Sequence, residues 1–338
     1  MTVLMVTYNG ADYMERCLGS LRAQTVPVRL VVVDNGSEDG TADTVERLWP
    51  EATILREQEN HGFCKGNNLA AAQARTPFIM LLNQDTVLEP DCIEQLLATQ
   101  AAHPEAGLIM AKVLLDHQPA GRRIINSIGN HANYLMFPSR VSGGLPDDDR
   151  KRPFEVQYVS GAAFLMRRDL YEELGGLDEA LWMYQDDLDL SLRVRMLGHR
   201  PLCAPLAVVH HDYHGEHAPW KMHFLERNRL MLLRKFYRKR ALWLMAPILV
   251  ASEAGLLLVA ARGGWLKEKL RAYKGFWKPD ADSMADAERL REISGHSDAW
   301  LFTFLGPDLG VDAPTHTRLE GLGKWLFRAY YHLIRRFL

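Results

Sequence analysis

Three carboxylates stand close together at Asp186, Asp187 and Asp189. Apolar residues recur at helical spacing from Leu188 to Met196, which predicts a helix that begins at these acids. Acids in a first helical turn are stabilised by exposed backbone N–H groups and by the helix dipole, and Asp189 can pair with Arg193 four residues later. The stretch is therefore either an ordinary acidic helix start or the place of a general base.

Polar and aromatic residues also follow the continuous apolar runs at residues 3–6, 30–33 and 78–82. Apolar runs without alternation predict strands that are buried on both faces, as in a parallel sheet covered by helices. Ligands bind beyond the carboxyl ends of such strands. The candidate binding residues at these ends are Thr7, Tyr8, Asn9, Asp34, Asn35, Asn83 and Asp85. Turn formation is an alternative explanation for these residues. For the helix after the second run, the N-cap is expected at Ser37 or Asp39.

The segment from Glu59 to Asn68 contains two glycines and three asparagines ahead of a helix predicted at residues 69–74. Backbone and amide donors at a helix start can bind a diphosphate or a ribose. The segment lacks the glycine patterns of P-loop and dinucleotide-binding proteins, which argues against an ATPase and a dehydrogenase. Its candidate binding residues are Asn60, Gly62, Phe63, Lys65 and Asn67.

Two features could hold a metal ion. Asp85 follows a strand beside the expected diphosphate site, and such an acid suits a hard divalent cation, although it could also simply begin a turn. Four histidines lie within residues 210–217, after a strand predicted at residues 202–209. They match no zinc-binding spacing, so one functional histidine among polar loop residues is expected.

The middle of the chain contains a loop at residues 143–152 and an apolar strand at residues 158–166. The loop is rich in Asp, Gly and Pro, and a solvated surface loop is favoured over a lid. The strand carries Gly161 and Ala162 at its middle, and these small residues leave room for a ligand or a packed helix.

Composition bounds the classes of protein that are compatible with this sequence. The 338 residues include 40 basic and 42 acidic side chains, so no global basic field points to a nucleic-acid partner. The four cysteines are widely spaced, without a Cys-x-x-Cys pair and without a signal peptide ahead of them, which indicates a reduced, cytoplasmic setting.

Taken in order, these motifs resemble the family-two inverting glycosyltransferases, in particular the rhamnosyltransferase-like subgroup that acts on lipid-linked or cell-surface glycans. The resemblance covers roughly residues 1–217. The segments that carry it are Val6 to Asn9, Val33 to Ser37, Asn60 to Asn68, Leu82 to Thr86 and Leu177 to Arg193.

The resemblance implies an α/β fold, a Rossmann-like, mostly parallel sheet of the A-type glycosyltransferase fold. It implies that residues 1–100 bind the nucleotide sugar, a dTDP-, UDP- or GDP-sugar, and that residues 101–217 form the acceptor and catalytic half. Asp34 would contact the base, and Asp85 would hold Mg²⁺ or Mn²⁺ on the donor diphosphate. His211 fits the position of a further metal ligand, with His210 as its rival.

The same resemblance makes Asp187 the general base. Asp186 stands where the family usually has Glu, and would orient the base or bind the acceptor. The acceptor, a polyprenyl-linked compound or a glycan, would meet Gly161, Ala162, Trp182 and Tyr184. An inverting transfer needs a base for the acceptor hydroxyl and a cation for the departing diphosphate, which these residues supply. The rival functions are a sugar nucleotidyltransferase and a non-catalytic binding scaffold.

Residues 218–338 are expected to form a helical, membrane-associating extension. A basic segment at residues 227–240 precedes an apolar run at residues 241–261, which Pro247, Glu253 and Gly255 interrupt. The central acid argues for an interfacial helix or a re-entrant pair over a membrane span.

The chain ends in a second basic amphipathic helix, whose apolar stripe is Leu319, Leu322, Leu326, Tyr330, Leu333 and Phe337. The expected location is cytoplasmic, peripherally attached to the inner, anionic face of the cell membrane. Ordinary core helices, or the interface helices of a homodimer, are the alternative for both segments.

Overall fold

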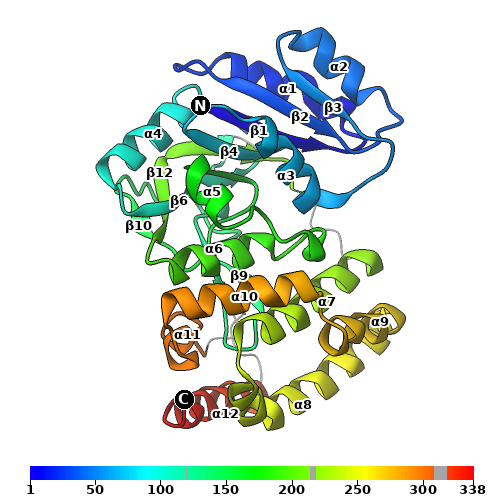
Figure 1. Ribbon diagram of the computed structural model, residues 1–338, viewed down its shortest axis with the longest axis vertical. Helices are drawn as coiled ribbons and strands as arrows, with labels where there is room; N and C mark the ends of the chain where they lie inside the picture. The colour runs from blue at the N-terminus through cyan, green and yellow to red at the C-terminus, as the bar shows by residue number, and fades with distance from the viewer. Residues whose placement is uncertain (119–120, 214–217, 308–317) are drawn as a thin grey trace. The chain divides into compact units, whose positions relative to one another are not determined.

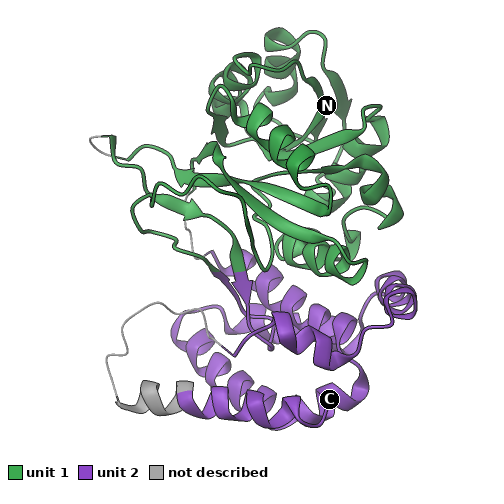
Figure 2. Ribbon diagram, turned by 90° about the vertical axis from the view of Figure 1, so that its left-hand side faces the viewer, with its two compact units in different colours: residues 1–130, 140–214 green, residues 131–139, 215–338 purple. Residues whose placement is uncertain are grey.

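The computed structural model describes residues 1–118, 121–213, 218–307 and 318–338. The chain forms two compact units, of which unit 1 comprises residues 1–130 and 140–214 and unit 2 comprises residues 131–139 and 215–338 (Figure 2). The sequence-based division at residue 217 kept the segment 131–139 in the catalytic domain. In the structure, this segment packs with the C-terminal helices of unit 2.

A parallel half-sheet forms the N-terminal part of unit 1, as the apolar runs predicted (Figure 1). Its strand order is β4-β1-β2-β3. The strands are β1 (Thr2–Thr7), β2 (Arg29–Asp34), β3 (Thr53–Arg56) and β4 (Phe78–Asn83).

The sheet continues beyond β4 through the antiparallel strand β11, which pairs with both β4 and β6. Beyond it, β6 and β12 run parallel to one another. The short strands β10 and β5 pair with β12, and β7 pairs with β6. The bounds are β5 (Thr86–Leu88), β6 (Ala106–Leu115), β7 (Ile125–Ser127), β10 (Phe154–Glu155), β11 (Ala163–Arg167) and β12 (Arg200–His211).

Helices cover both faces of the sheet, which explains why its strands are apolar without alternation. Val3 and Met5 belong to a core that includes Met14 and Leu18 of α1, whereas Val6, of opposite parity on β1, contacts α3 at Gly66. The helices of unit 1 are α1 (Ala11–Arg22), α2 (Thr41–Leu48), α3 (Gly62–Gln73), α4 (Cys92–Ala102), α5 (Arg168–Glu173) and α6 (Asp186–Met196).

Several predicted boundaries are wrong. Helix α3 begins at Gly62 rather than at residue 69, because the Asn60 side chain accepts a hydrogen bond from the Gly62 amide and starts the helix there. The N-cap of α2 is Gly40, with φ of 82°, rather than Ser37 or Asp39. The Asp39 carboxylate still accepts a hydrogen bond from the Thr41 amide.

Two predicted strands also have different bounds. Strand β11 begins at Ala163, so Gly161 and Ala162 lie in the segment just before it rather than at its middle. Strand β12 continues to His211, which places His210 and His211 within the strand. Their pairing with β5 and β6 accounts for this extension.

The loop at residues 143–152 is anchored to the sheet at Asp147. Its carboxylate accepts a hydrogen bond from Lys112 Nζ at 2.7 Å and one from Arg123 Nε at 3.1 Å. The Lys112 and Asp147 side chains are both buried. Because Asp147 fixes the loop at residues 143–152 to the sheet, the structure supports the prediction of a surface loop over that of a lid.

Helix α6 contains the predicted pair of Asp189 and Arg193, which is confirmed. Arg193 Nε donates to Asp189 Oδ2 at 2.7 Å, and both side chains are buried. A second guanidinium nitrogen of Arg193 donates to the Leu174 carbonyl at 2.9 Å. The pair therefore ties the first turns of α6 to the end of α5.

Unit 2 is helical and is built around an aromatic core. Tyr134, from the hairpin of β8 (Asn130–Ala132) and β9 (Pro138–Arg140), lies 4.6 Å from Phe327 and 5.4 Å from Tyr331 between ring centroids. The apolar run 241–261 forms one continuous helix through Pro247, so the re-entrant pair is wrong. The helices are α7 (Pro219–Phe236), α8 (Lys239–Arg262), α9 (Leu266–Trp277), α10 (Ala281–Ser294), α11 (Asp298–Phe304) and α12 (Arg318–Arg335).

Replacement of Asp189 by Ala should destabilise unit 1 strongly, because it leaves the Arg193 guanidinium buried without its counter-ion. We expect a loss of about 3 to 5 kcal/mol in the free energy of unfolding. The matched control is Glu172→Ala, which breaks an exposed pair with Arg168 at the same spacing and should cost about 0.5 kcal/mol. Urea unfolding measures both, and equal losses would show that the buried pair does not hold α6.

Candidate active site

The carboxyl ends of β1 and β2 hold the Asp34 carboxylate in a fixed orientation. Thr7 Oγ1 donates to Asp34 Oδ1 at 3.2 Å, and the Ser37 hydroxyl donates to the same oxygen. Asp34 and Thr7 are buried. The sequence analysis named Ser37 as a possible helix cap and as the end of the segment Val33 to Ser37, but not as a partner of Asp34. Its position three residues after Asp34 is the local signal that could have indicated this bond.

Tyr8 and Asn9 follow β1 and are hydrogen-bonded to residues of two neighbouring loops. The Asn9 amide donates to Ser37 Oγ at 2.9 Å, and Asn9 Oδ1 accepts from the Glu38 amide at 2.9 Å. The Tyr8 amide donates to Gln84 Oε1 at 3.1 Å, while the ring is about half exposed. Gln84 was not singled out in the sequence, and it links the end of β1 to the loop that carries Asp85.

The start of α3 meets the segment that precedes the acids. The Asn35 side chain donates to the Gly62 carbonyl at 3.0 Å, and the Cys64 amide donates to the Trp182 carbonyl at 3.0 Å. Gly62 has φ of +82°, and a Cβ there would lie 2.6 Å from the Trp182 indole. Position 62 therefore requires glycine for two reasons: its backbone has a positive φ, and a side chain there would collide with the Trp182 indole.

The remaining residues of this segment divide between exposed and buried positions. Phe63 and Lys65 are partly exposed, whereas Asn67 is buried and its amide donates to the Phe63 carbonyl at 2.9 Å within the helix. Asn67 therefore uses its amide nitrogen in a bond within α3. Asn68, which the sequence did not distinguish, accepts from the Tyr171 hydroxyl at 2.6 Å and donates to the Leu177 carbonyl at 2.9 Å.

The segment before the acids has an unusual backbone. Trp182, Tyr184 and Gln185 all have positive φ, at 64°, 67° and 59°. Non-glycine residues in this region carry strain that the surrounding structure must offset, and such residues gather at functional sites. The sharp path directs Asp186 and Asp187 toward Gly161.

Gly161 lies against the two acids. Its amide donates to Asp187 Oδ2 at 3.1 Å, and the Leu188 amide donates to Asp187 Oδ1 at 2.8 Å. A Cβ on Gly161 would lie 3.8 Å from carboxylate oxygens of both Asp186 and Asp187. The neighbouring Ala162 carbonyl accepts from the Asn83 amide at 2.9 Å, which joins this segment to the end of β4.

The two acids differ in their environments. Burial raises the pKa of Asp186, and the adjacent charge of Asp187 raises it further. Burial also raises the pKa of Asp187, but the amides of Gly161 and Leu188 favour its ionised form and offset part of that rise. Asp187 is partly exposed, whereas Asp186 is buried. Asp187 is therefore the better placed of the two to act as an ionised base, and Asp186 to remain protonated.

Asp85 and His211 lie together at the ends of β4 and β12. His211 Nε2 is 3.3 Å from Asp85 Oδ1, and His211 Nδ1 is 3.4 Å from Asn126 Oδ1. His210 points elsewhere, with its Nε2 3.3 Å from Glu89 Oε1. His214 and His217 lie outside the described residues.

An oxygen and an imidazole nitrogen at this separation fit the protein ligands of a divalent cation. The described ranges contain no group of three or more His, Cys, Asp or Glu side chains that could hold a metal ion. Within those ranges Asp85 and His211 are two candidate ligands, and Mg²⁺ at phosphate sites usually completes its coordination with water and substrate oxygens.

Tyr184 lies two residues before Asp186 and is partly buried. Burial raises its pKa to about 12, with smaller contributions from Tyr213 and Asp186. The Tyr213 ring lies 5.6 Å from that of His211. The predicted acceptor residue Tyr184 therefore interacts electrostatically with Asp186 of the acid segment and with Tyr213. Tyr213 in turn lies beside His211 of the Asp85 and His211 pair.

Replacement of Gly62 by Ala should destabilise unit 1 more than replacement of Gly40, although both glycines have φ of +82°. Gly40 has no atom within 4 Å of the added Cβ, so Gly40→Ala should cost only about 1 to 2 kcal/mol, from the backbone. Gly62→Ala must also displace the Trp182 indole, which adds about 1 to 3 kcal/mol. Urea unfolding compares the two, and equal costs would contradict the indole contact.

Comparison with known proteins identifies the family of this chain. Residues 2–175 match the model of glycosyl transferase family 2. The N-acetylglucosaminyl-diphospho-decaprenol L-rhamnosyltransferase of Mycobacterium tuberculosis is 30% identical over 237 residues, which cover 64% of this chain and 77% of the relative. The O-antigen chain rhamnosyltransferase RfbN of Salmonella typhimurium is 26% identical over 218 residues, which cover 63% of this chain and 66% of that protein.

Solved structures show the same fold. GalNAc-T7 aligns with a TM-score of 0.61 and 15% identity, over 89% of this chain and 56% of that one. The mannosyltransferase PcManGT from Pyrobaculum calidifontis aligns with a TM-score of 0.50 and 18% identity, over 98% and 85%. The match over more than half of the chain, together with this A-type fold, places the protein in glycosyltransferase family 2, as an enzyme that transfers a sugar.

Proposed function

We propose that this enzyme is an inverting, metal-dependent glycosyltransferase that moves a rhamnosyl group from a nucleotide-diphosphate donor to a polyprenyl-diphosphate-linked acceptor. The observation that carries the proposal is the pair of acids at the start of α6, with Asp187 held by the Gly161 amide at 3.1 Å. The names of the mycobacterial and Salmonella relatives supply the sugar, and that of the mycobacterial relative supplies the class of acceptor.

In the proposed reaction, Asp187 removes the proton from an acceptor hydroxyl. The acceptor oxygen then forms a bond to the anomeric carbon from the face opposite the donor diphosphate. The bond from that carbon to the diphosphate oxygen breaks, its electron pair leaves with the diphosphate, and the configuration inverts. Asp186, whose pKa is raised by burial and by the charge of Asp187, would orient the acceptor.

The donor would bind along the carboxyl ends of β1, β2 and β4. The fixed carboxylate of Asp34 suits a hydrogen bond from the base or ribose, with Thr7 and Asn35 supporting it. Tyr8, Asn9, Asn83 and the partly exposed residues at the start of α3 would complete the site. Of these, Lys65 supplies positive charge for the diphosphate.

Asp85 and His211 would hold a divalent cation, Mg²⁺ or Mn²⁺, on that diphosphate. When bound, the cation would neutralise the charge that develops on the leaving group. Two proteins of the same fold have been solved with a nucleotide or nucleotide sugar and Mn²⁺. They are GalNAc-T7, with UDP and Mn²⁺, and PcManGT, with GDP-Man and Mn²⁺.

The acceptor would approach over Gly161, where the absence of a side chain leaves Asp187 accessible. Ala162, Trp182 and Tyr184 would form the wall of that approach. A polyprenyl-linked acceptor is held in a bilayer, so the enzyme would work at the cytoplasmic face of the cell membrane.

Replacement of Asp187 by Asn should abolish transfer while donor binding is retained, because it removes the base and keeps the shape. We expect the rate to fall about 10² to 10⁴-fold. The assay supplies dTDP-, UDP- and GDP-sugars with Mn²⁺ and a polyprenyl-diphosphate-linked N-acetylglucosamine, and titration calorimetry measures donor affinity. The control is Asp169→Asn, an exposed acid on α5.

The dependence of the wild-type rate on pH supplies a second readout of the same prediction. Because burial raises the pKa of Asp187, kcat/KM should rise with pH through a value above the ordinary carboxyl range. Loss of donor affinity in Asp187→Asn would show that the base is misplaced. No transfer with any of the donors would overturn the proposed reaction.

Replacement of His211 by Ala should weaken Mn²⁺ binding at least about tenfold, since it removes one of two protein ligands. His210→Ala is the matched control and should change the affinity little, because His210 faces Glu89. Electron paramagnetic resonance counts free Mn²⁺ in the presence of the nucleoside diphosphate, without any need for turnover. Equal effects of the two changes would contradict the assignment.

A further inference from the structure

The outward face of α8 is apolar and uncovered. By length and composition this helix could cross a membrane, and it is the one such helix in the part of the chain that the structure describes. Core helices pass the same test, but only 11% of its most apolar window is buried. The large exposed side chains, which we call the outer face, are Trp243 (80% exposed), Val250 (69%), Leu258 (62%) and Val259 (55%).

No charge interrupts the outer face. From Ala241 to Ala261 the sole ionisable residue is Glu253, and it points into unit 2. The charges of α8 lie at its ends, where Lys239, Arg240 and Arg262 are exposed. An apolar surface bounded by basic residues is typical of helices that lie at an anionic membrane surface.

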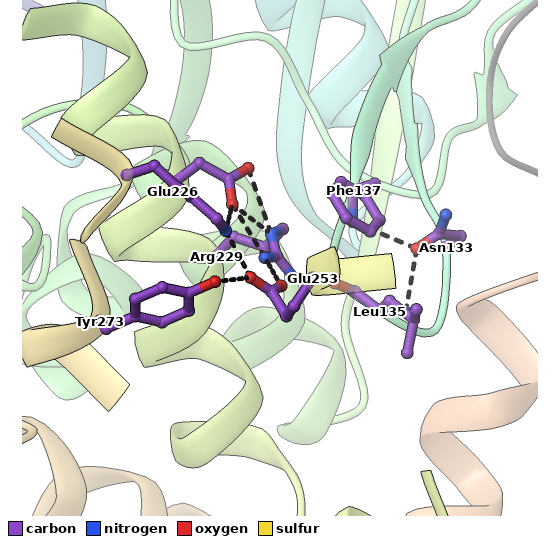
Figure 3. A network of polar contacts seen from close by, with 8 residues as sticks. Asn133, Leu135, Phe137, Glu226, Arg229, Glu253 and Tyr273 are labelled. Carbon is purple, nitrogen blue, oxygen red and sulfur yellow. Dashed lines mark hydrogen bonds and ion pairs between the residues drawn. The ribbon is translucent and has the colours of Figure 1, made fainter. Parts of the chain in front are cut away.

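Glu253 is held by side chains of the neighbouring helices, of which Figure 3 labels Arg229 and Tyr273. Its carboxylate pairs with Arg229 of α7, and with Lys269 Nζ of α9 at 2.5 Å. It also accepts a hydrogen bond from the Tyr273 hydroxyl at 2.9 Å. The acid that interrupts the apolar run is thus neutralised inside the helical unit.

A second acid makes the cluster neutral. Glu226 accepts from Arg229 at 2.9 Å and from Lys269 at 2.5 Å, so two carboxylates face two cations. Arg229 and Lys269 are fully buried. If α8 left unit 2 to cross a bilayer, Glu253 would enter lipid and leave these two cations with one counter-ion, which is costly in both places.

Helices α9 and α12 expose similar surfaces. On α9, Leu270 and Trp277 are exposed among Lys267, Arg271 and Lys274. Helix α12 contacts α8, with the Tyr330 hydroxyl bonded to the Leu244 carbonyl at 2.7 Å.

Helix α12 has two apolar sides. It buries Phe327, Tyr331 and Ile334 and exposes Leu326 and Leu333 of the stripe predicted from the sequence. Phe337 of that stripe is also exposed, but it lies after the end of the helix. The side chains of Leu319 and Leu322 lie outside the described residues. An apolar side remains uncovered after the core is complete.

We infer that α8 lies in the plane of an anionic bilayer, with its outer face in the lipid, and that the cluster of Glu226, Arg229, Glu253 and Lys269 keeps it there instead of letting it span. The inference deepens the membrane location proposed above by specifying the surface and the mode of attachment.

A second copy of the chain fits the outer face less well than a bilayer does. Two-fold pairing through α8 would bring the basic ends of two copies together, where like charges repel. Anionic headgroups would instead neutralise them. Exposed tryptophans such as Trp243, Trp277 and Trp325 are also typical of the membrane interface.

Sedimentation of the full-length protein with lipid vesicles tests the surface. We expect binding to vesicles of phosphatidylcholine with phosphatidylglycerol, weaker binding to phosphatidylcholine alone, and a decrease with salt. The double change Val250→Glu and Leu258→Glu should lower binding at least about tenfold. Both positions are exposed, and the control is Ile293→Glu on α10, where the side chain is 61% exposed.

Cysteine labelling tests the mode of attachment. Lys239→Cys and Arg262→Cys mark the two ends of α8, and the four native cysteines are buried. A membrane-impermeant maleimide should label both ends in inverted bacterial membrane vesicles and neither end in right-side-out vesicles. Labelling of the two ends from opposite sides would show a span and overturn the inference.

Two other results would overturn the proposed surface. One is vesicle binding that the double change leaves at the wild-type level. The other is a dimer in analytical ultracentrifugation that the double change dissociates, in a protein that binds no vesicles. Donor hydrolysis should survive the double change, so failure of the membrane surface and failure of the proposed chemistry give separate results.

Discussion

The burial of adjacent carboxylates at the start of α6 is the constraint on which the rest of unit 1 depends. Three acids within four residues repel one another, and burial disfavours their charged forms. Each has a different compensation in the structure. Asp189 pairs with Arg193, Asp187 accepts two backbone N–H bonds, and Asp186 has its pKa raised by burial and by its neighbour. One dense group of acids thus separates into an ion pair, a carboxylate whose charge two backbone amides stabilise, and a carboxyl whose neutral form is favoured by burial and by its neighbour.

The same constraint explains the contacts around Trp182. The positive φ values at Trp182, Tyr184 and Gln185 direct the acids toward Gly161, and this backbone must be held from outside. Helix α3 holds this backbone in two ways. The Cys64 amide donates a hydrogen bond to the Trp182 carbonyl, and Gly62, which has no side chain, leaves room for the Trp182 indole. Because α3 also meets Asn35, elements of the N-terminal parallel sheet help to position the acid segment. The two halves that the sequence suggested are therefore physically coupled.

Local patterns predicted part of this arrangement. The apolar runs predicted buried parallel strands, and the spacing of Asp189 and Arg193 predicted their pair, because both depend on neighbours close in sequence. The choice between His210 and His211 depends on the pairing of β12 with β5, which no local pattern encodes. The hairpin tip at residues 131–139 joins unit 2 through Tyr134, again by contacts distant in sequence. The assignments of Ser37, Gln84 and Asn68 likewise needed the partners that the fold brings to them.

Glu253 shows why composition alone misjudges an apolar helix. In the sequence, a single acid within residues 241–261 is a penalty against membrane insertion, and its size depends on whether the charge faces lipid. The structure brings Arg229, Lys269 and Tyr273 to that acid from two other helices. The charge of Glu253 is then neutralised inside unit 2, and residues 241–261 of α8 carry no other ionisable side chain. A charge in such a segment can therefore fix which side of the helix faces inward, and so favour attachment to a surface over passage through it.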